Sequence, residues 1–421
     1  MRILEISKKH WQKFIKNQLI TGSVIMFLGT NIHNAGQLLY HYLAINLLSK
    51  AHYGDLASLV SIFGLLSIVQ QSISLAVIKF IAQEKNTTEA NNLARWILIV
   101  SFWVSAAMAI LILLLSPVIS RFLQITQPLA VYLFAPVVFI TFISNTGRAI
   151  LQGFTKFTQF SVSMVVEVSI KIVSTLTLIL LGYEIFGAII GILIGAIIGV
   201  LMVWLYIKEK LKGKVNTVKN FIPLIKYFLP TLLQSIAVTG MLSTDIILVK
   251  HFFQPDAAGA YAALSKFGTI ALFATSPITS VMFPLIAKKH SHGQPYHKIF
   301  YLSLSFVVGI SSLVVILYFT FGTFITNILT KGKYINEAYL LWWFGLYMLL
   351  LGAAILFTQF YLSIGKTKTV WVFIAAAVLQ VILILAFHPS LLSIIQDSII
   401  ASALLVGLLS LYFPYHDKIH I

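Results

Sequence analysis

The sequence predicts an all-α polytopic membrane protein with twelve transmembrane helices. Of its 421 residues, 59% are hydrophobic and 10% are charged, whereas a soluble domain carries roughly a quarter charged residues. Apolar windows of about 20 residues, the length that crosses about 30 Å of hydrocarbon, recur along the chain. The 29 basic residues outnumber the 12 acidic ones and gather in alternate connecting segments. These observations exclude a water-soluble globular protein.

The predicted spans follow one another with short charged or turn-forming breaks between them. They cover residues 18–47, 55–81, 93–115, 128–150, 158–181, 185–207, 222–250, 257–286, 298–320, 338–362, 368–387 and 391–413. A membrane β-barrel would instead show alternating strands of about 10 residues. The windows are continuously apolar and about twice that length, so helices are expected.

Basic residues predict the orientation of the chain. With the N-terminus in the cytoplasm, twenty-two of the 29 fall on the inside, five fall outside and two lie within spans. Lysine and arginine are enriched in cytoplasmic loops, so both termini are expected to be cytoplasmic. The apolar run after the basic N-terminus is too long for a cleavable signal and is interpreted as a retained first span. The net charge of +17 then needs no nucleic-acid partner.

The longest basic loop divides the spans into two sets of six. The expected organisation is an N-terminal lobe over residues 1–207, a cytoplasmic linker over 208–220 and a C-terminal lobe over 221–421. A shift of 205 positions aligns 43–82 with 248–287 and equates Gly54 with Gly259. Six spans per half give both halves the same orientation, as in a parallel repeat about an axis along the membrane normal.

Soluble-type catalysis has no evident site in this chain. There is no cysteine, and we find no phosphate-binding glycine loop, no His-Glu-x-x-His and no nucleophile with an obvious base. The protein is therefore expected not to be an enzyme and to need no metal or cofactor. Polar residues inside the spans are the informative ones, because a charge at the bilayer centre costs about 2.5–3.5 kcal/mol even on mild scales.

The fifth span carries Glu167 and Lys171, four residues apart, with Ser163 and Ser174 on the same face. One interpretation is a self-neutralising pair that merely tolerates burial. The other is a cavity wall whose lysine meets an anionic head group. A similar choice applies to Asp245 in the seventh span and Lys266 in the eighth.

Asp245 and Lys266 either form an interhelical salt bridge in the second half or contact a substrate or coupling ion. Polar residues also line the first two spans, among them Asn34, Gln37 and Gln70. Interhelical hydrogen bonding or a hydrated lumen would each explain them. His33 is a candidate protonation site, although a lone histidine commonly serves as a packing donor.

Several stretches resemble bacterial polysaccharide exporters in their order and spacing. They are LLSKAHYGDLA at 47–57, RAILQGFTKF at 148–157, TDIILVKHFF at 244–253, AGAYA at 258–262, MFPL at 282–285 and KGKY at 331–334. The resemblance extends over nearly the whole chain. The sequence thus resembles the oligosaccharide (O-antigen or polysaccharide repeat-unit) flippases of the multidrug/oligosaccharidyl-lipid/polysaccharide exporter superfamily.

That resemblance implies two six-helix lobes arranged as a V around a central cavity. It also implies flipping of a lipid-linked oligosaccharide, an undecaprenyl-pyrophosphate glycan, across the bacterial inner membrane by alternating access. Family members tend to have cationic residues in the cavity, for which Arg148, Lys171 and Lys266 are the candidates here. Membrane lipids, a polysaccharide polymerase and other assembly proteins of the lipopolysaccharide O-antigen pathway would be the partners. Glu167, Asp245 and His33 are the candidates for ion coupling or charge pairing.

Two other functions are compatible with the sequence. An ion-coupled multidrug or small-molecule antiporter of the same superfamily would favour acidic cavity residues for cationic drugs. An oligosaccharide polymerase would be expected to carry a large outward loop with arginine and histidine, and the longest outward loop here is short.

Overall fold

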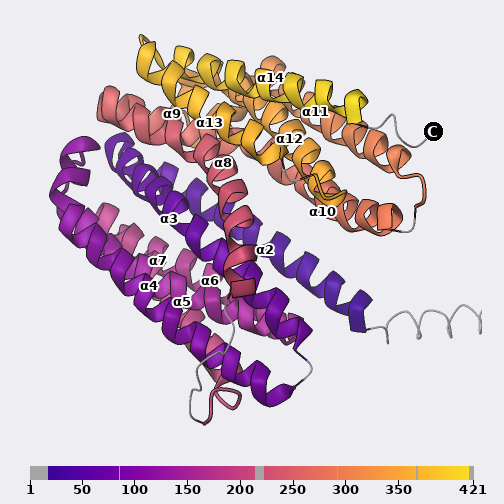
Figure 1. Cartoon of the computed structure of the whole chain (residues 1–421). Coiled ribbons are helices and arrows are strands. Elements are labelled where there is room, and N and C mark those ends of the chain that lie inside the picture. The colour runs from indigo at the N-terminus through magenta and orange to yellow at the C-terminus, as the bar shows by residue number, and fades with distance from the viewer. Residues whose placement is uncertain (1–17, 85, 214–221, 292, 367, 417–421) are drawn as a thin grey trace, which may run out of the picture. The chain divides into compact units, whose positions relative to one another are not determined.

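The computed structural model describes residues 18–84, 86–213, 222–291, 293–366 and 368–416 (Figure 1). These residues form helices joined by short connections, and no strand occurs among them. A helix satisfies its backbone hydrogen bonds within its own segment, so it can cross hydrocarbon without exposing unpaired groups. The all-α polytopic membrane fold expected from the sequence is confirmed.

Helices in the first half correspond to the first six predicted spans. They are α2 (Gln18–Leu47), α3 (Lys50–Gln83), α4 (Thr87–Phe122), α5 (Leu129–Gly153), α6 (Phe157–Leu178) and α7 (Glu184–Ile207). The π-helix η1 (Ile179–Tyr183) joins α6 to α7, and Gly182 within it has φ of 90°. Glycine adopts this backbone readily because it has no Cβ, so the chain reverses between two apolar windows.

The second half holds the remaining spans, one of them divided. Its helices are α8 (Ile222–Phe252), α9 (Pro255–Gly268), α10 (Ile270–Ser291), α11 (His297–Thr330), the 3₁₀ turn η2 (Ile335–Leu340), α12 (Leu341–Ser363), α13 (Thr369–Ala386) and α14 (Leu391–His416). The predicted span 257–286 is thus two helices that break at Thr269. The Thr269 hydroxyl donates to the Lys266 carbonyl at 2.6 Å, and such bonds compete with the helical ladder.

Ten helical stretches in the described part of the chain are long and apolar enough to cross a membrane. The longest, Phe157–Ile207, has 51 residues and contains both α6 and α7. Its two halves run antiparallel, because Gly191 lies against Thr175 and Gly199 against Glu167. The chain is therefore a multi-pass membrane protein.

Residues group into two compact units. The first comprises Met1–Tyr40, Val69–Val118 and Gln127–Leu229, and the second comprises His41–Ile68, Ile119–Thr126 and Pro230–Ile421. The turn between α2 and α3 therefore belongs to the second unit, whereas the other ends of both helices belong to the first. The division into sequence lobes at 208–220 stays a prediction.

Candidate functional site

A buried ion pair between α5 and α6 is the centre of the polar cluster in the first unit. The Arg148 guanidinium donates to the Glu167 carboxylate, and Arg148 is only 4% exposed. Arg148 also donates from Nε to the Ser163 hydroxyl at 3.1 Å and from Nη1 to the Asn145 side-chain oxygen at 3.2 Å. Ser144 donates to the same Glu167 oxygen at 3.2 Å. The guanidinium is held in place by several bonds, as a buried charge requires.

Lys171 lies one turn further along α6 and does not share this carboxylate. Its ammonium donates to the side-chain oxygen of Gln37 on α2 and lies 3.8 Å from the centre of the Tyr40 ring. The side chain is 7% exposed. In the described residues no ion pair joins Lys171 to Glu167, although four-residue spacing places them on one helix face. The i,i+4 pair considered from the sequence is thus replaced by a pair between helices.

A chain of hydrogen bonds continues from Gln37 to His33. The Gln37 side-chain nitrogen lies 3.1 Å from Nε2 of His33, and Nδ1 of His33 lies 3.2 Å from the Met164 carbonyl. A carbonyl only accepts, which assigns the proton of the neutral imidazole to Nδ1 and leaves Nε2 to accept from Gln37. Lys171 therefore donates to Gln37, Gln37 donates to His33, and His33 donates to the Met164 carbonyl.

The glycines of α7 allow this cluster to form. A Cβ built on Gly195 would lie 2.8 Å from the Lys171 Cβ, and one on Gly199 would overlap the Glu167 carboxylate and lie 2.9 Å from Arg148 Nη2. Small residues let helix backbones approach closely in membranes. These two glycines of α7 thus pack directly against the charged face of α6.

Two other candidates from the first half lie apart from these bonds. Gln70 on α3 is 5% exposed and donates to Ser74 of its own helix at 2.6 Å. Asn34 is half-buried on α2, one turn before Gln37. The structure therefore brings together Arg148, Glu167, Lys171, Gln37 and His33 from the sequence candidates.

Asp245 and Lys266 lie in the second unit. The Asp245 carboxylate, 1% exposed, accepts from the Tyr261 hydroxyl at 2.9 Å and from the Ile246 backbone N–H at 2.8 Å. No ion pair between Asp245 and Lys266 is present among the described residues. Lys266 is half-buried in the last turn of α9. The interhelical salt bridge considered from the sequence is therefore not formed.

Sequence reasoning missed three buried charged residues of the second unit. Lys250 and Asp55 form an ion pair of 2.6 Å, and both lie near ends of predicted spans, where water was expected. Asp397 on α14 is 6% exposed, and its Oδ2 has no hydrogen-bond partner in the described part of the chain. An acidic residue within an apolar window was the signal for Asp397.

Solved structures share this fold over nearly the full chain. A multidrug resistance MATE family transporter of the MOP superfamily, in an inward-facing conformation, matches with a TM-score of 0.78 and 15% identity, covering 96% of this chain and all of the other. The lipid II flippase MurJ, in an inward closed conformation, matches with a TM-score of 0.76 and 18% identity. The match covers 94% of this chain and 87% of MurJ. A MOP superfamily transporter from Pyrococcus furiosus matches with a TM-score of 0.62 and 16% identity. The match covers 95% of this chain and 96% of the other. At these identities the likeness concerns the fold alone.

No individual curated protein sequence matches this chain. A family model described as "Polysaccharide biosynthesis protein" matches residues 19–290, which is more than half of the chain. The resemblance to polysaccharide exporters seen in the sequence is thereby confirmed. The chain belongs to the polysaccharide biosynthesis protein family and has the fold of MOP superfamily transporters.

Proposed function

We propose that this protein flips a lipid-linked oligosaccharide across the bacterial cytoplasmic membrane for cell-surface polysaccharide biosynthesis. The substrate class is a polyprenyl-pyrophosphate glycan, which includes O-antigen repeat units of lipopolysaccharide. The family membership supports a role in polysaccharide synthesis, and a flippase for lipid II shares the fold. Both termini are proposed to be cytoplasmic, on the distribution of basic residues.

The observation that carries this proposal is the environment of Lys171. Its ammonium is buried and contacts an amide oxygen and an aromatic ring, with no carboxylate within ion-pair distance among the described residues. An isolated buried charge is costly unless it is compensated. A phosphate oxygen would supply the missing opposite charge, and charge-assisted hydrogen bonds of this kind are strong.

Arg148 is less suited to that role because Glu167 already neutralises it. The pair plus Lys171 leaves the cluster one positive charge in excess, which favours an anion over a cationic drug. Lys266 of the second unit, half-buried and next to the break between α9 and α10, is proposed as a second contact for the substrate. The prenyl tail would stay in the lipid while the charged head group crosses.

An antiporter for small cations is the second candidate function. Asp245 and Asp397 favour it, because both carboxylates are buried in the second unit and neither forms an ion pair with a described basic residue. Buried acidic residues are suited to carry protons or metal cations. In a flippase the same two residues would serve ion coupling.

Complementation of a flippase-deficient bacterial strain tests the main proposal. Lys171→Met keeps the length and apolar stem of the side chain and should reduce glycan export at least tenfold at an unchanged membrane level. Lys298→Met, at an exposed lysine of α11, is the matched control and should export normally. Normal export by Lys171→Met would remove Lys171 from the substrate site, whereas failure of the native protein to restore export, together with efflux of a cationic dye that depends on Asp245, would favour the antiporter instead.

A further inference from the structure

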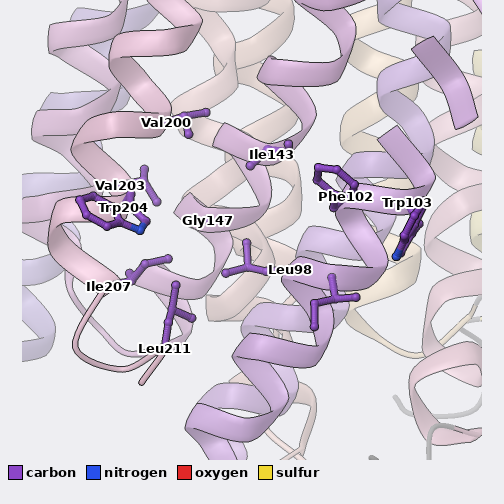
Figure 2. Close-up of a pocket in the computed structure, with 11 residues that line it drawn as sticks. Leu98, Phe102, Trp103, Ile143, Gly147, Val200, Val203, Trp204, Ile207 and Leu211 are labelled. Carbon is purple, nitrogen blue, oxygen red and sulfur yellow. The ribbon is translucent and has the colours of Figure 1, made fainter. Parts of the chain in front are cut away.

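An apolar groove opens on the surface of the first unit, and its lining residues do not include Arg148, Glu167, Lys171, Gln37 or His33. Its volume is about 440 Å³. Figure 2 shows Leu98, Phe102 and Trp103 of α4 on one side, Val203 and Trp204 of α7 on the other, and Gly147 of α5 between them. The groove therefore lies where three helices meet.

The floor of the groove is tightly packed and its walls are exposed. A Cβ on Gly147 would lie 2.4 Å from Val203 Cγ1, so α5 and α7 are already in close contact there. Behind them Val203 joins a buried cluster with Ile97, Ala149 and Ile150. Trp103 and Trp204 on the walls are 67% and 52% exposed. Such a surface binds an apolar chain in preference to water.

Basic side chains surround one end of the groove. Lys208 follows the groove residue Ile207 directly, and its ammonium lies 5.8 Å from the centre of the Trp204 ring. The Lys210 ammonium lies 3.9 Å from the Phe154 ring. Arg95, one turn before Leu98, donates to the Lys212 backbone carbonyl at 2.9 Å.

Among the described residues, Glu209 is the acidic side chain paired with a basic one at this end of the groove. Glu209 binds Lys212 at 2.6 Å, whereas the contacts of Lys208 and Lys210 described above are aromatic rings and those of Arg95 are backbone carbonyls. An apolar groove with a cationic end matches a lipid that has an acyl chain and an anionic phosphate.

We infer that this groove is a binding site for an anionic phospholipid. One acyl chain lies between α4 and α7, and the phosphate lies beside Lys208 and Lys210. This inference does not depend on which substrate is transported. Basic loops gather on the cytoplasmic side, so the lipid belongs to the cytoplasmic leaflet.

Fluorescence quenching by brominated lipids tests this inference on the full-length protein in vesicles. The Trp204 signal is the difference between the native protein and Trp204→Phe. Dibrominated phosphatidylglycerol should quench that signal at a concentration at least fivefold lower than dibrominated phosphatidylcholine of the same chain length. One basic residue near an anionic surface contributes about 1 kcal/mol, which corresponds to about a fivefold change in affinity.

Lysine substitutions test where the head group of the bound phospholipid lies. Lys208→Gln combined with Lys210→Gln should abolish the preference for phosphatidylglycerol, whereas Lys289→Gln with Lys298→Gln, the matched control, should keep it. Equal quenching by both lipids in the native protein would overturn the inference and indicate ordinary boundary lipid. A preference that survives the Lys208 and Lys210 changes would overturn it as well.

Competition identifies the occupant. Unlabelled phosphatidylglycerol should displace the brominated lipid at a lower concentration than undecaprenyl phosphate does. The opposite order would mean that the groove holds the tail of the prenyl substrate, and the assignment to a phospholipid would be wrong.

Discussion

Gly54 and Gly259 lie against each other in the second unit: a Cβ on Gly54 would be 3.0 Å from the backbone nitrogen of Gly259. The weak internal repeat equates these same two positions. The beginnings of α3 and α9 therefore meet through the two residues that the repeat equates. This contact places backbone against backbone, without room for a side chain on either partner.

Gly259→Ala should therefore destabilise the protein. The added Cβ would lie 2.0 Å from the Lys50 backbone carbonyl, and forced overpacking costs typically about 1–3 kcal/mol. Thermal unfolding in detergent should show a lower midpoint. Gly309→Ala on α11 is the matched control, since its Cβ would meet no atom within 4 Å. Equal midpoints for the two variants would contradict the contact.

The buried pair of Asp55 and Lys250 should be strongly sensitive to removal of one partner. The two side chains are 0% and 1% exposed, and Asp55 also accepts from the Thr126 backbone N–H at 2.9 Å. Loss of one member of a buried pair costs about 3–5 kcal/mol because the other charge remains. Lys250→Met should thus lower the yield of folded protein measured by size-exclusion chromatography.

Removal of both charges separates pairing from other roles of these residues. Asp55→Asn combined with Lys250→Met leaves no unpaired charge and should recover much of the lost yield. If the double variant unfolds as readily as Lys250→Met alone, the pair is not the reason for the sensitivity.

Protonation of His33 should change how Lys171 is held. A second N–H on the imidazole would face the Gln37 amide nitrogen, so the amide must turn its oxygen to His33 and leave the Lys171 ammonium without that acceptor. The charged groups that face His33 are Glu167 and Lys171 of α6 and Arg148 of α5. Acidification should therefore free Lys171 for an anionic ligand.

Binding of a polyprenyl phosphate at pH 5.5 and 7.5 measures this coupling. The affinity ratio between the two pH values should be larger for the native protein than for His33→Gln, which cannot gain the proton. The phosphate of the ligand also titrates between these pH values, and the His33→Gln variant corrects for that contribution because it binds the same ligand. Identical ratios would separate His33 from the Lys171 site.

The stability of the protein should also depend on pH above neutrality, through the ammonium group of Lys333. Its ammonium donates to the carbonyls of Ile45, at 2.7 Å, and Leu48 near the end of α2. Burial, with a smaller contribution from Lys50, lowers the pKa of Lys333 to about 8. The unfolded state then binds more protons between about pH 8 and the ordinary lysine value of about 10.4, so stability rises with pH in this window.

Thermal midpoints between pH 7.5 and 10.5 test that sign. The native protein should gain stability relative to Lys333→Met as the pH rises, because the cost of burying the charge disappears. Lys331→Met, at an exposed neighbour, should follow the native curve. Parallel curves for the native protein and Lys333→Met would contradict the lowered pKa.

Hydropathy was sufficient to predict the spans, because the length of a membrane helix is set by the bilayer. The partners of the charged side chains were not predictable in the same way. The spacing of Glu167 and Lys171 suggested a pair within one helix, whereas Arg148 on α5 supplies the partner instead. Asp55 and Lys250 lie 195 positions apart, so only tertiary packing could identify them as a pair.

The glycines of α7 differ in what they lie against, and this has a consequence for tolerance to mutation. Beside Gly191 the near atoms include the Thr175 backbone, whereas beside Gly199 they are the side-chain ends of Glu167, Arg148 and Ser144. Alanine at Gly191 must separate two helices, and alanine at Gly199 needs only to displace an ion pair. In a saturation scan scored for both abundance and glycan export, position 191 should fail in abundance, while position 199 should remain abundant and fail in export.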